Sequence, residues 1–309
     1  MTNLTKFRES FKIDRRANLE IAATAIEAIY TTADIGFDYL ENFQPRDDAA
    51  GFRIRSLHNM LARVFEHAQA MLVALVTGSD ASSEALARIV VEGSINIMYL
   101  ATLGDAATLV QVFRLWVKEH DRKLSEWSSE VEGEIYARSV RAMIEERRKV
   151  VVALDRFIAQ VETQCSFSAT ATSPEWPKAI FKRFEALGRQ TDYYQSYHRL
   201  SGASHVTAED TLMWMFALQM PSEYLQRMGA EAWAYSIMMS RIASTFFVDA
   251  AAACVIAYGP AALAKISPGL LGKTSPEGLR DSARNSARVE GRKVVADGDR
   301  FAAPQSKAA

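Results

Sequence analysis

The sequence predicts an all-α fold, a multi-helix bundle with long antiparallel helices. Apolar residues recur at spacings of three and four over long stretches, as on one face of an α-helix. Helix breakers are scarce in the first half of the chain, where Pro45 is the only proline before Pro174. No stretch stands out for the alternation of apolar and polar residues that is typical of a strand. Long helices with short breaks favour neighbours that run antiparallel.

Breaks in the periodicity divide the chain into successive helices. Pro45 ends the first helix, and the stretch Thr77–Asp80 combines a terminating glycine with residues that cap the next helix. Pro174 and Pro177 suit the first turn of a short helix that ends near Leu187. The longer predicted helices cover about residues 13–43, 52–76, 81–103, 105–127, 130–163, 208–220 and 230–258.

The helix over residues 130–163 is unusual in its length and in its dense pattern of charges. That length suits a lever or a dimer-forming hairpin arm. A solvated amphipathic helix explains the same pattern.

Composition changes at Pro260, which separates two predicted regions. Residues 1–259 are predicted to form a single helical domain, because the chain of 309 residues is ample for a real core. Residues 260–309 are rich in Pro, Gly, Ser and charge, with nine basic and five acidic residues. We therefore expect them to form a disordered, weakly basic tail.

Charge and cysteine content narrow the function classes. The formal net charge is -1, whereas a dedicated nucleic-acid binder usually has a basic surplus, although a local basic groove stays open. Cys165 and Cys254 lie in unrelated contexts, which favours a reducing, cytoplasmic setting. Residues 242–259 are nearly long enough to span a membrane, but Asp249 at a bilayer centre would cost roughly 2.5–3.5 kcal/mol. We expect a buried core helix there and no stable membrane insertion.

Four polar residues share one side of the otherwise apolar helix over residues 81–103. Glu92, Asn96 and Tyr99 lie about 40°, 80° and 20° from Arg88 around the helix axis. Charges on such a helix are either exposed or buried with partners. A surface ion pair of small energetic value is one interpretation. The apolar residues around them leave little face for solvent, which favours an interior polar group.

A second polar cluster is YYQSYHRLSGASH, Tyr193–His205. Its thirteen residues include three tyrosines, two of the five histidines, one arginine and three serines. As a straight helix, this stretch aligns His198, Ser201 and His205 within about 40° of Tyr194. A tyrosine-rich packing helix with satisfied histidines is the alternative. The density of polar groups predicts a polar pocket inside the bundle.

Together these segments resemble a bacterial helical family named only as a domain of unknown function. Its first motif is R-x-x-x-E followed by apolar residues and Tyr-Leu, here Arg88, Glu92, Tyr99 and Leu100. Its second motif is Y-x-x-x-S-x-x-x-H, preceded by a tryptophan, here Tyr197, Ser201, His205 and Trp176. The resemblance covers roughly residues 50–260.

More distantly, Arg199 and His205 resemble the R-x(4–6)-H motif of HEPN domains. These helical bundles occur in ribonuclease toxins and phage-defence proteins, and active members cleave RNA without metal at a dimer interface. The resemblance implies that His205 is the general acid/base and that Arg199 stabilises charge developing on the phosphate. Leu200 departs from the polar residue that often follows the arginine. On a straight helix Arg199 and His205 would lie about 120° apart, so their side chains converge only if the chain kinks at Gly202.

Two functions follow as expectations. One is a HEPN-like, metal-independent endoribonuclease or phage-defence effector, in which Arg88, oriented by Glu92, is an alternative source of the cation. The other is a non-enzymatic helical binding or scaffold module whose buried polar residues are structural. The expected catalytic residues are His205 and Arg199, and the expected pocket residues are Arg88, Glu92, Asn96, Tyr99, Tyr194, Tyr197, His198 and Ser201.

Expected partners are RNA, a second copy of the chain or another protein. No cofactor is expected, and no HExxH or ExxH spacing that would hold a metal occurs in the sequence.

Overall fold

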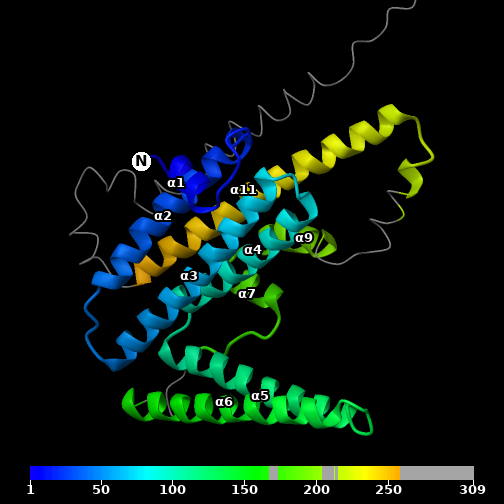
Figure 1. The fold of residues 1–309 in the computed structure, drawn as a ribbon. Helices are drawn as coiled ribbons and strands as arrows, with labels where there is room; N and C mark the ends of the chain where they lie inside the picture. The colour runs from blue at the N-terminus through cyan, green and yellow to red at the C-terminus, as the bar shows by residue number, and fades with distance from the viewer. Residues whose placement is uncertain (167–172, 204–211, 213–214, 258–309) are drawn as a thin grey trace, which may run out of the picture. The chain divides into compact units, whose positions relative to one another are not determined.

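The computed structural model describes residues 1–166, 173–203, 212 and 215–257. All regular structure in these ranges is helical, which confirms the predicted all-α fold (Figure 1). The long helices are α2 (Ala23–Asn42), α3 (Asp48–Val76), α4 (Asp80–Thr102), α5 (Ala106–Glu130), α6 (Ala137–Gln164) and α11 (Ser222–Ala257). The short ones are α1 (Asn3–Ser10), η1 (Glu20–Ala22), α7 (Ile180–Ala186), α8 (Gln190–Asp192), η2 (Tyr193–Tyr197) and α9 (His198–Ala203).

Two compact units are formed, each assembled from separate stretches of the chain. Among the described residues, unit 1 contains Met1–Phe43, His58–Tyr99 and those from Ala179 onward, and unit 2 contains Gln44–Leu57 and those between Leu100 and Lys178. The prediction of a single helical domain over residues 1–259 stays a prediction. The tail predicted over residues 260–309 and most of the helix predicted over residues 208–220 lie outside the described residues.

A chain of aromatic rings runs through the core of unit 1. Phe7 of α1 packs edge-on against Tyr30 of α2, with ring centroids 6.1 Å apart. Tyr30 packs against Phe65 of α3 at 5.5 Å, and Phe65 packs against Phe247 of α11 at 6.0 Å. In Figure 1, α2 and α11 lie side by side. These rings therefore join four helices, and their burial contributes strongly to the stability of the core.

Within unit 1, α4 packs closely against α3 and α11. A Cβ atom added at Gly93 of α4 would lie 2.5 Å from Cγ2 of Val64 on α3, so there is no room for a larger residue. Ser83 of α4 donates to the carbonyl oxygen of Met71 at 3.2 Å and shares a hydrogen bond of 2.9 Å with Ser240 of α11. Because α4 has neighbours on both sides, its polar residues can reach the interior of the unit.

One predicted helix begins later in the structure than the sequence indicates. Instead of a continuous helix over residues 13–43, α2 begins at Ala23, directly after the short η1, and α1 lies before the predicted range. Oδ1 of Asp14 accepts a hydrogen bond from the Arg16 backbone N–H at 2.7 Å, and Oδ1 of Asn18 accepts one from the Glu20 backbone N–H at 2.9 Å. Lys12 also has a positive φ of 51°. Such local hydrogen bonds compete with the helical backbone pattern, which explains why the helix does not begin near residue 13.

Two described helices, α4 and α11, are long and apolar enough to cross a membrane by length and composition alone. In the folded protein, 78% of the apolar window of α11 and 56% of that of α4 are buried. The expected absence of membrane insertion stays a prediction.

Unit 2 is dominated by a hairpin of α5 and α6, which pack along their length (Figure 1). Asp105 caps the start of α5 by accepting from the Thr108 N–H at 2.8 Å, and Thr108 completes a capping box. The turn between the helices contains Gly133 with a φ of 90°, a conformation that glycine adopts easily. Because of this turn, α6 begins at Ala137 and not near residue 130.

Candidate functional site

The structure brings the two predicted polar segments together inside unit 1. The Tyr197 hydroxyl of η2 donates to Oε2 of Glu92 on α4 at 3.0 Å, and it accepts from Nη2 of Arg88 at 3.1 Å. The Arg88 guanidinium also lies over the Tyr197 ring, 5.0 Å from its centroid. Tyr197 therefore bridges a cation and an anion that lie one turn apart on α4.

A π-helical turn, η2, determines which side chains of this segment face inward. It lies between the α-helical segments α8 and α9, and its wider turn changes the phase of the side chains that follow. Ser196 and Tyr197 are buried, whereas Tyr194 and His198 are exposed. The straight-helix row that was predicted for Tyr194 and His198 thus lies on the outer side of this turn, where their rings are in contact with each other at 6.1 Å.

Hydrogen bonds to the backbone stabilise this irregular turn. The Ser196 hydroxyl donates to the carbonyl oxygen of Asp192 at 2.5 Å, and the Ser201 hydroxyl donates to that of Tyr197 at 3.0 Å. Ser201, a predicted pocket residue, therefore has a local structural contact.

Arg183 of α7 is the most important residue of the site that the sequence analysis missed. It is 7% exposed, and its guanidinium donates to the side-chain oxygen of Asn96 on α4. Burial lowers the pKa of Arg183, while the negative charge of Glu92 acts in the opposite direction. The helical spacing indicated that Arg183 would face the interior, because it lies on the same face of its helix as Ile180, Phe184 and Leu187.

A second charged cluster lies around Arg189, also in unit 1. Its Nη1 donates to Oδ2 of Asp249 on α11 at 2.8 Å, and its Nε donates to Oδ2 of Asp192 at 2.6 Å. The guanidinium also lies 4.6 Å from the centroid of the Phe246 ring. Asp249, the charge that interrupts the apolar sequence of α11, is therefore neutralised inside the protein by an arginine.

The remaining predicted site residues are Tyr99, Arg199 and His205. Tyr99 is buried, and Arg199 is exposed with its guanidinium 5.9 Å from the centroid of the Tyr235 ring on α11. His205, the predicted general acid/base, lies outside the described residues. The geometry between Arg199 and His205 is therefore not described.

Tyr197 is held in its protonated form near neutral pH. Burial raises the pKa of its phenol, the Arg88 hydrogen bond lowers it, and the nearby charge of Glu92 raises it. A protonated phenol can donate to Glu92, as observed, but it does not act as a base. Among the described residues, no group of three or more His, Cys, Asp or Glu side chains could hold a metal ion.

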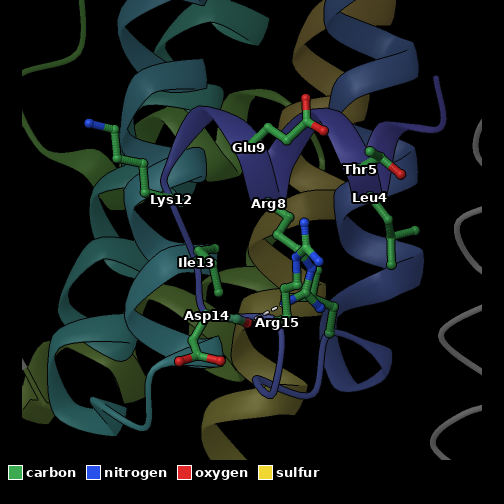
Figure 2. Close-up of a pocket in the computed structure, with 9 residues that line it drawn as sticks. Leu4, Thr5, Arg8, Glu9, Lys12, Ile13, Asp14 and Arg15 are labelled. Atoms are coloured by element: carbon green, nitrogen blue, oxygen red, sulfur yellow. Dashed lines mark hydrogen bonds between the residues drawn. The ribbon is translucent and has the colours of Figure 1, made fainter.

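A hollow of about 830 Å³ lies elsewhere in unit 1, between α1 and the segment that follows it. Figure 2 shows its lining, from Leu4 and Thr5 on α1 to Asp14 and Arg15 beyond the helix. Arg8, one of the lining residues, donates to the backbone carbonyl oxygens of Asp14 and Ala17. These bonds close the loop after α1, so this arginine has a structural role.

Comparison with known proteins provides a family but no characterised relative. No curated protein and no solved structure gives a significant match. A family model described as a family of unknown function, DUF5677, matches residues 55–215. The match spans more than half of the chain and contains the Arg88, Glu92 and Tyr197 positions, and it confirms the expected kind of family. The chain belongs to this family of unknown function.

Proposed function

We propose that the chain is a non-enzymatic helical binding or scaffold module whose buried polar side chains hold its helices together. The observation that carries this proposal is the Tyr197 hydroxyl between Arg88 and Glu92, at 3.1 and 3.0 Å. The Tyr197 hydroxyl is thus engaged with both charged groups inside unit 1. A catalytic group, in contrast, must keep a hydrogen-bonding position open for its substrate.

The charged pairs around this bridge support a structural role. Arg183 contacts Asn96, and Arg189 contacts both Asp192 and Asp249. The Arg183–Asn96 and Arg189–Asp249 contacts join segments of unit 1 that are distant in the sequence, whereas the Arg189–Asp192 pair is local. A buried charge that loses its partner is strongly unfavourable, so such contacts select one packing of the helices over others.

A metal-independent, HEPN-like ribonuclease is the second candidate, and one observation favours it. Arg199 keeps an exposed guanidinium on α9, so a phosphate could reach it. In this alternative, His205 would supply the proton transfer and RNA would be the substrate. This candidate retains the defence or toxin role that the HEPN resemblance implies.

Thermal melting and RNA degradation, measured on the same variants, separate the two functions. Replacing Tyr197 by Phe removes the bridging hydroxyl and should lower stability by about 1–3 kcal/mol. Each kcal/mol corresponds to roughly 2–4 °C in Tm for a chain of this size. Tyr194→Phe is the matched control, because this tyrosine is in the same turn but is exposed, and its Tm should be unchanged. We expect no RNA degradation by the wild type above a buffer control.

The opposite pattern would replace the scaffold proposal by the nuclease. It consists of RNA cleavage by the wild type that is lost in both His205→Ala and Arg199→Ala, with the Tm of both variants unchanged. Equal cleavage by wild type and His205→Ala would instead remove His205 from any mechanism.

A further inference from the structure

The α5–α6 hairpin of unit 2 is joined along a single apolar seam. Its buried residues are Val117 and Leu124 on α5 and Ile144, Val151 and Ile158 on α6. Arg114 of α5 forms ion pairs with Asp155 and Glu162 of α6, and Arg148 of α6 donates to Ser125 of α5. These contacts place the start of α5 beside the end of α6, so the helices are antiparallel.

Both helices carry a second apolar stripe that is exposed. These residues, here called the hairpin face, are Trp116 and Trp127 on α5 and Met143, Val150, Leu154 and Phe157 on α6. Trp116 and Phe157 are each 52% exposed, and Val150 is 58% exposed. Such a group of large apolar side chains on one surface is a feature of interaction sites.

The two stripes lie on the same side of the hairpin. On each helix, the exposed stripe is rotated by about 80–90° from the buried seam, in the same sense relative to the chain direction. Two antiparallel helices that face each other are related by a two-fold axis perpendicular to both, and this axis brings equally rotated stripes to one side. Trp116 is also at the level of Phe157, given the contacts of Arg114 with the end of α6.

The charges beside the hairpin face are balanced. Between Trp116 and Trp127 on α5 and between Met143 and Phe157 on α6, the charged residues on this side of the helices are Glu119, Lys123, Glu126, Glu146, Arg147 and Lys149. Several of them form ion pairs within their own helices. Three acidic and three basic residues give no excess of either sign, unlike the basic surface that nucleic acid requires. An apolar centre rich in Trp, Phe and Met with a charged rim is typical of protein–protein interfaces.

We propose that the hairpin face pairs with the same face of a second copy of this chain, which forms a four-helix bundle from two hairpins. Met143, Val150 and Phe157 are spaced by seven residues, the repeat that packs one long helix against another. A second copy supplies stripes of the same length, and the balanced rim avoids repulsion between identical surfaces. This inference names a partner for the proposed scaffold function and rests on it.

The size of the hairpin agrees with this partner. A hairpin of 25-residue helices is about 37 Å long and about 20 Å wide, so its whole side measures roughly 750 Å² for each copy. A standard stable interface buries about 800 Å² for each partner. The apolar hairpin face covers only about 21 Å of this length, so the four-helix bundle buries the full side of the hairpin with the apolar face at its centre.

Sedimentation equilibrium of the full-length protein tests the inference. We expect the wild type to dimerise at concentrations up to about 100 µM, since interfaces of this size have dissociation constants of micromolar or lower. Val150→Glu combined with Leu154→Glu places unpaired charges in the interface and should weaken dimerisation by more than about 100-fold. Both positions are exposed in a single copy, so the circular dichroism spectrum should not change.

Val152→Glu is the matched control. Val152 is exposed on the same helix but lies about 170° around the axis from the centre of the stripe, so dimerisation should be retained. A wild type that stays monomeric up to about 100 µM, or equal weakening by the control, would overturn the inference. The scaffold proposal would be unaffected by that result, because it is decided by the Tyr197→Phe melting and the RNA assay.

Discussion

Unit 1 and the α5–α6 hairpin of unit 2 place charged and apolar side chains in opposite ways. Unit 1 buries Arg183 and Asp249 and gives each a partner, Asn96 and Arg189. The hairpin keeps its ion pairs at the surface and leaves Trp116, Val150 and Phe157 exposed. The buried charges of unit 1 restrict how its helices can pack, whereas the exposed apolar stripe of the hairpin is a surface that another molecule can cover.

This difference explains why charged residues on two long helices can have different effects on stability. Charged residues on a long helix usually lie on a face exposed to solvent, as they do on α6. On α4 and α11, however, some charged residues lie in the interior and contact a partner. Burial decides the energetic weight of each charge, because the attraction between two ions is weak in water and a lost partner is costly only inside the protein.

The largest expected effect comes from breaking one ion pair in each unit. Asp249→Ala removes the buried partner of Arg189, which keeps its second ion pair with the partly exposed Asp192, and should lower the free energy of unfolding by about 1–3 kcal/mol. Glu162→Ala is the matched change in the hairpin, where the pair with Arg114 is partly exposed, and should cost only about 0–1 kcal/mol. Urea denaturation measures both values.

A double replacement sharpens this comparison. Arg189→Met with Asp249→Leu removes both charges of the buried pair and should recover part of the stability lost in Asp249→Ala, because only the partly exposed Asp192 then loses its ion pair. Equal losses for Asp249→Ala and Glu162→Ala would show that the contrast between the two units has no energetic meaning.

A smaller effect is expected at Asp105, the helix cap of unit 2. Burial would raise the pKa of this carboxyl, but hydrogen bonds from the Thr108 and Ala107 backbones and from the Ser173 and Thr108 hydroxyls outweigh it and hold the pKa below its ordinary value. The cap therefore contributes fully above the unfolded-state pKa, near about 4, and its contribution is lost as the pH falls through the lower folded-state value.

Denaturation of wild type and Asp105→Asn at several pH values measures this contribution. Asparagine can cap the helix but does not titrate, so the variant should lose less stability below about pH 4. At pH 7, Asp105→Ala should lower stability by about 1 kcal/mol. Parallel pH curves for wild type and Asp105→Asn would rule out a contribution from the ionised cap.

The helical part of the fold was largely predictable because it depends on local patterns. Apolar periodicity and the Thr77–Asp80 break placed α3 and α4 within a few residues of their observed bounds. The late start of the first long helix was missed because Asp14 and Asn18 act through single hydrogen bonds, which leave no periodic signal. The last helix was predicted to begin near residue 230, but α11 begins at Ser222, directly after Pro221, since Gly229 does not interrupt it.

The candidate site was predictable on α4 but only in part elsewhere. The spacing of Arg88 and Glu92 indicated a shared face, and both contact Tyr197. The inward and outward directions around Tyr197 depend on the π-helical turn, which helical periodicity of 3.6 residues cannot represent. Arg183 required knowledge of which helix covers α4, and that is a property of tertiary packing.

The smallest expected effect belongs to the rim of the hairpin, at Glu119. The hydrogen bond from Arg122 lowers the pKa of Glu119 to about 2, with further help from the charges of Arg122 and Lys123. Arg122→Ala should return this pKa toward the ordinary glutamate value of about 4.3, which NMR titration of the carboxyl measures. The depressed pKa implies stabilisation that is present above the unfolded-state value and is lost as the pH falls toward 2. Both side chains are about half exposed, so water screens the pair and this stabilisation is small; we therefore expect Arg122→Ala to leave the Tm at pH 7 nearly unchanged. A clear loss of Tm there would mean that the rim charges of the hairpin contribute to stability as the interior charges of unit 1 do.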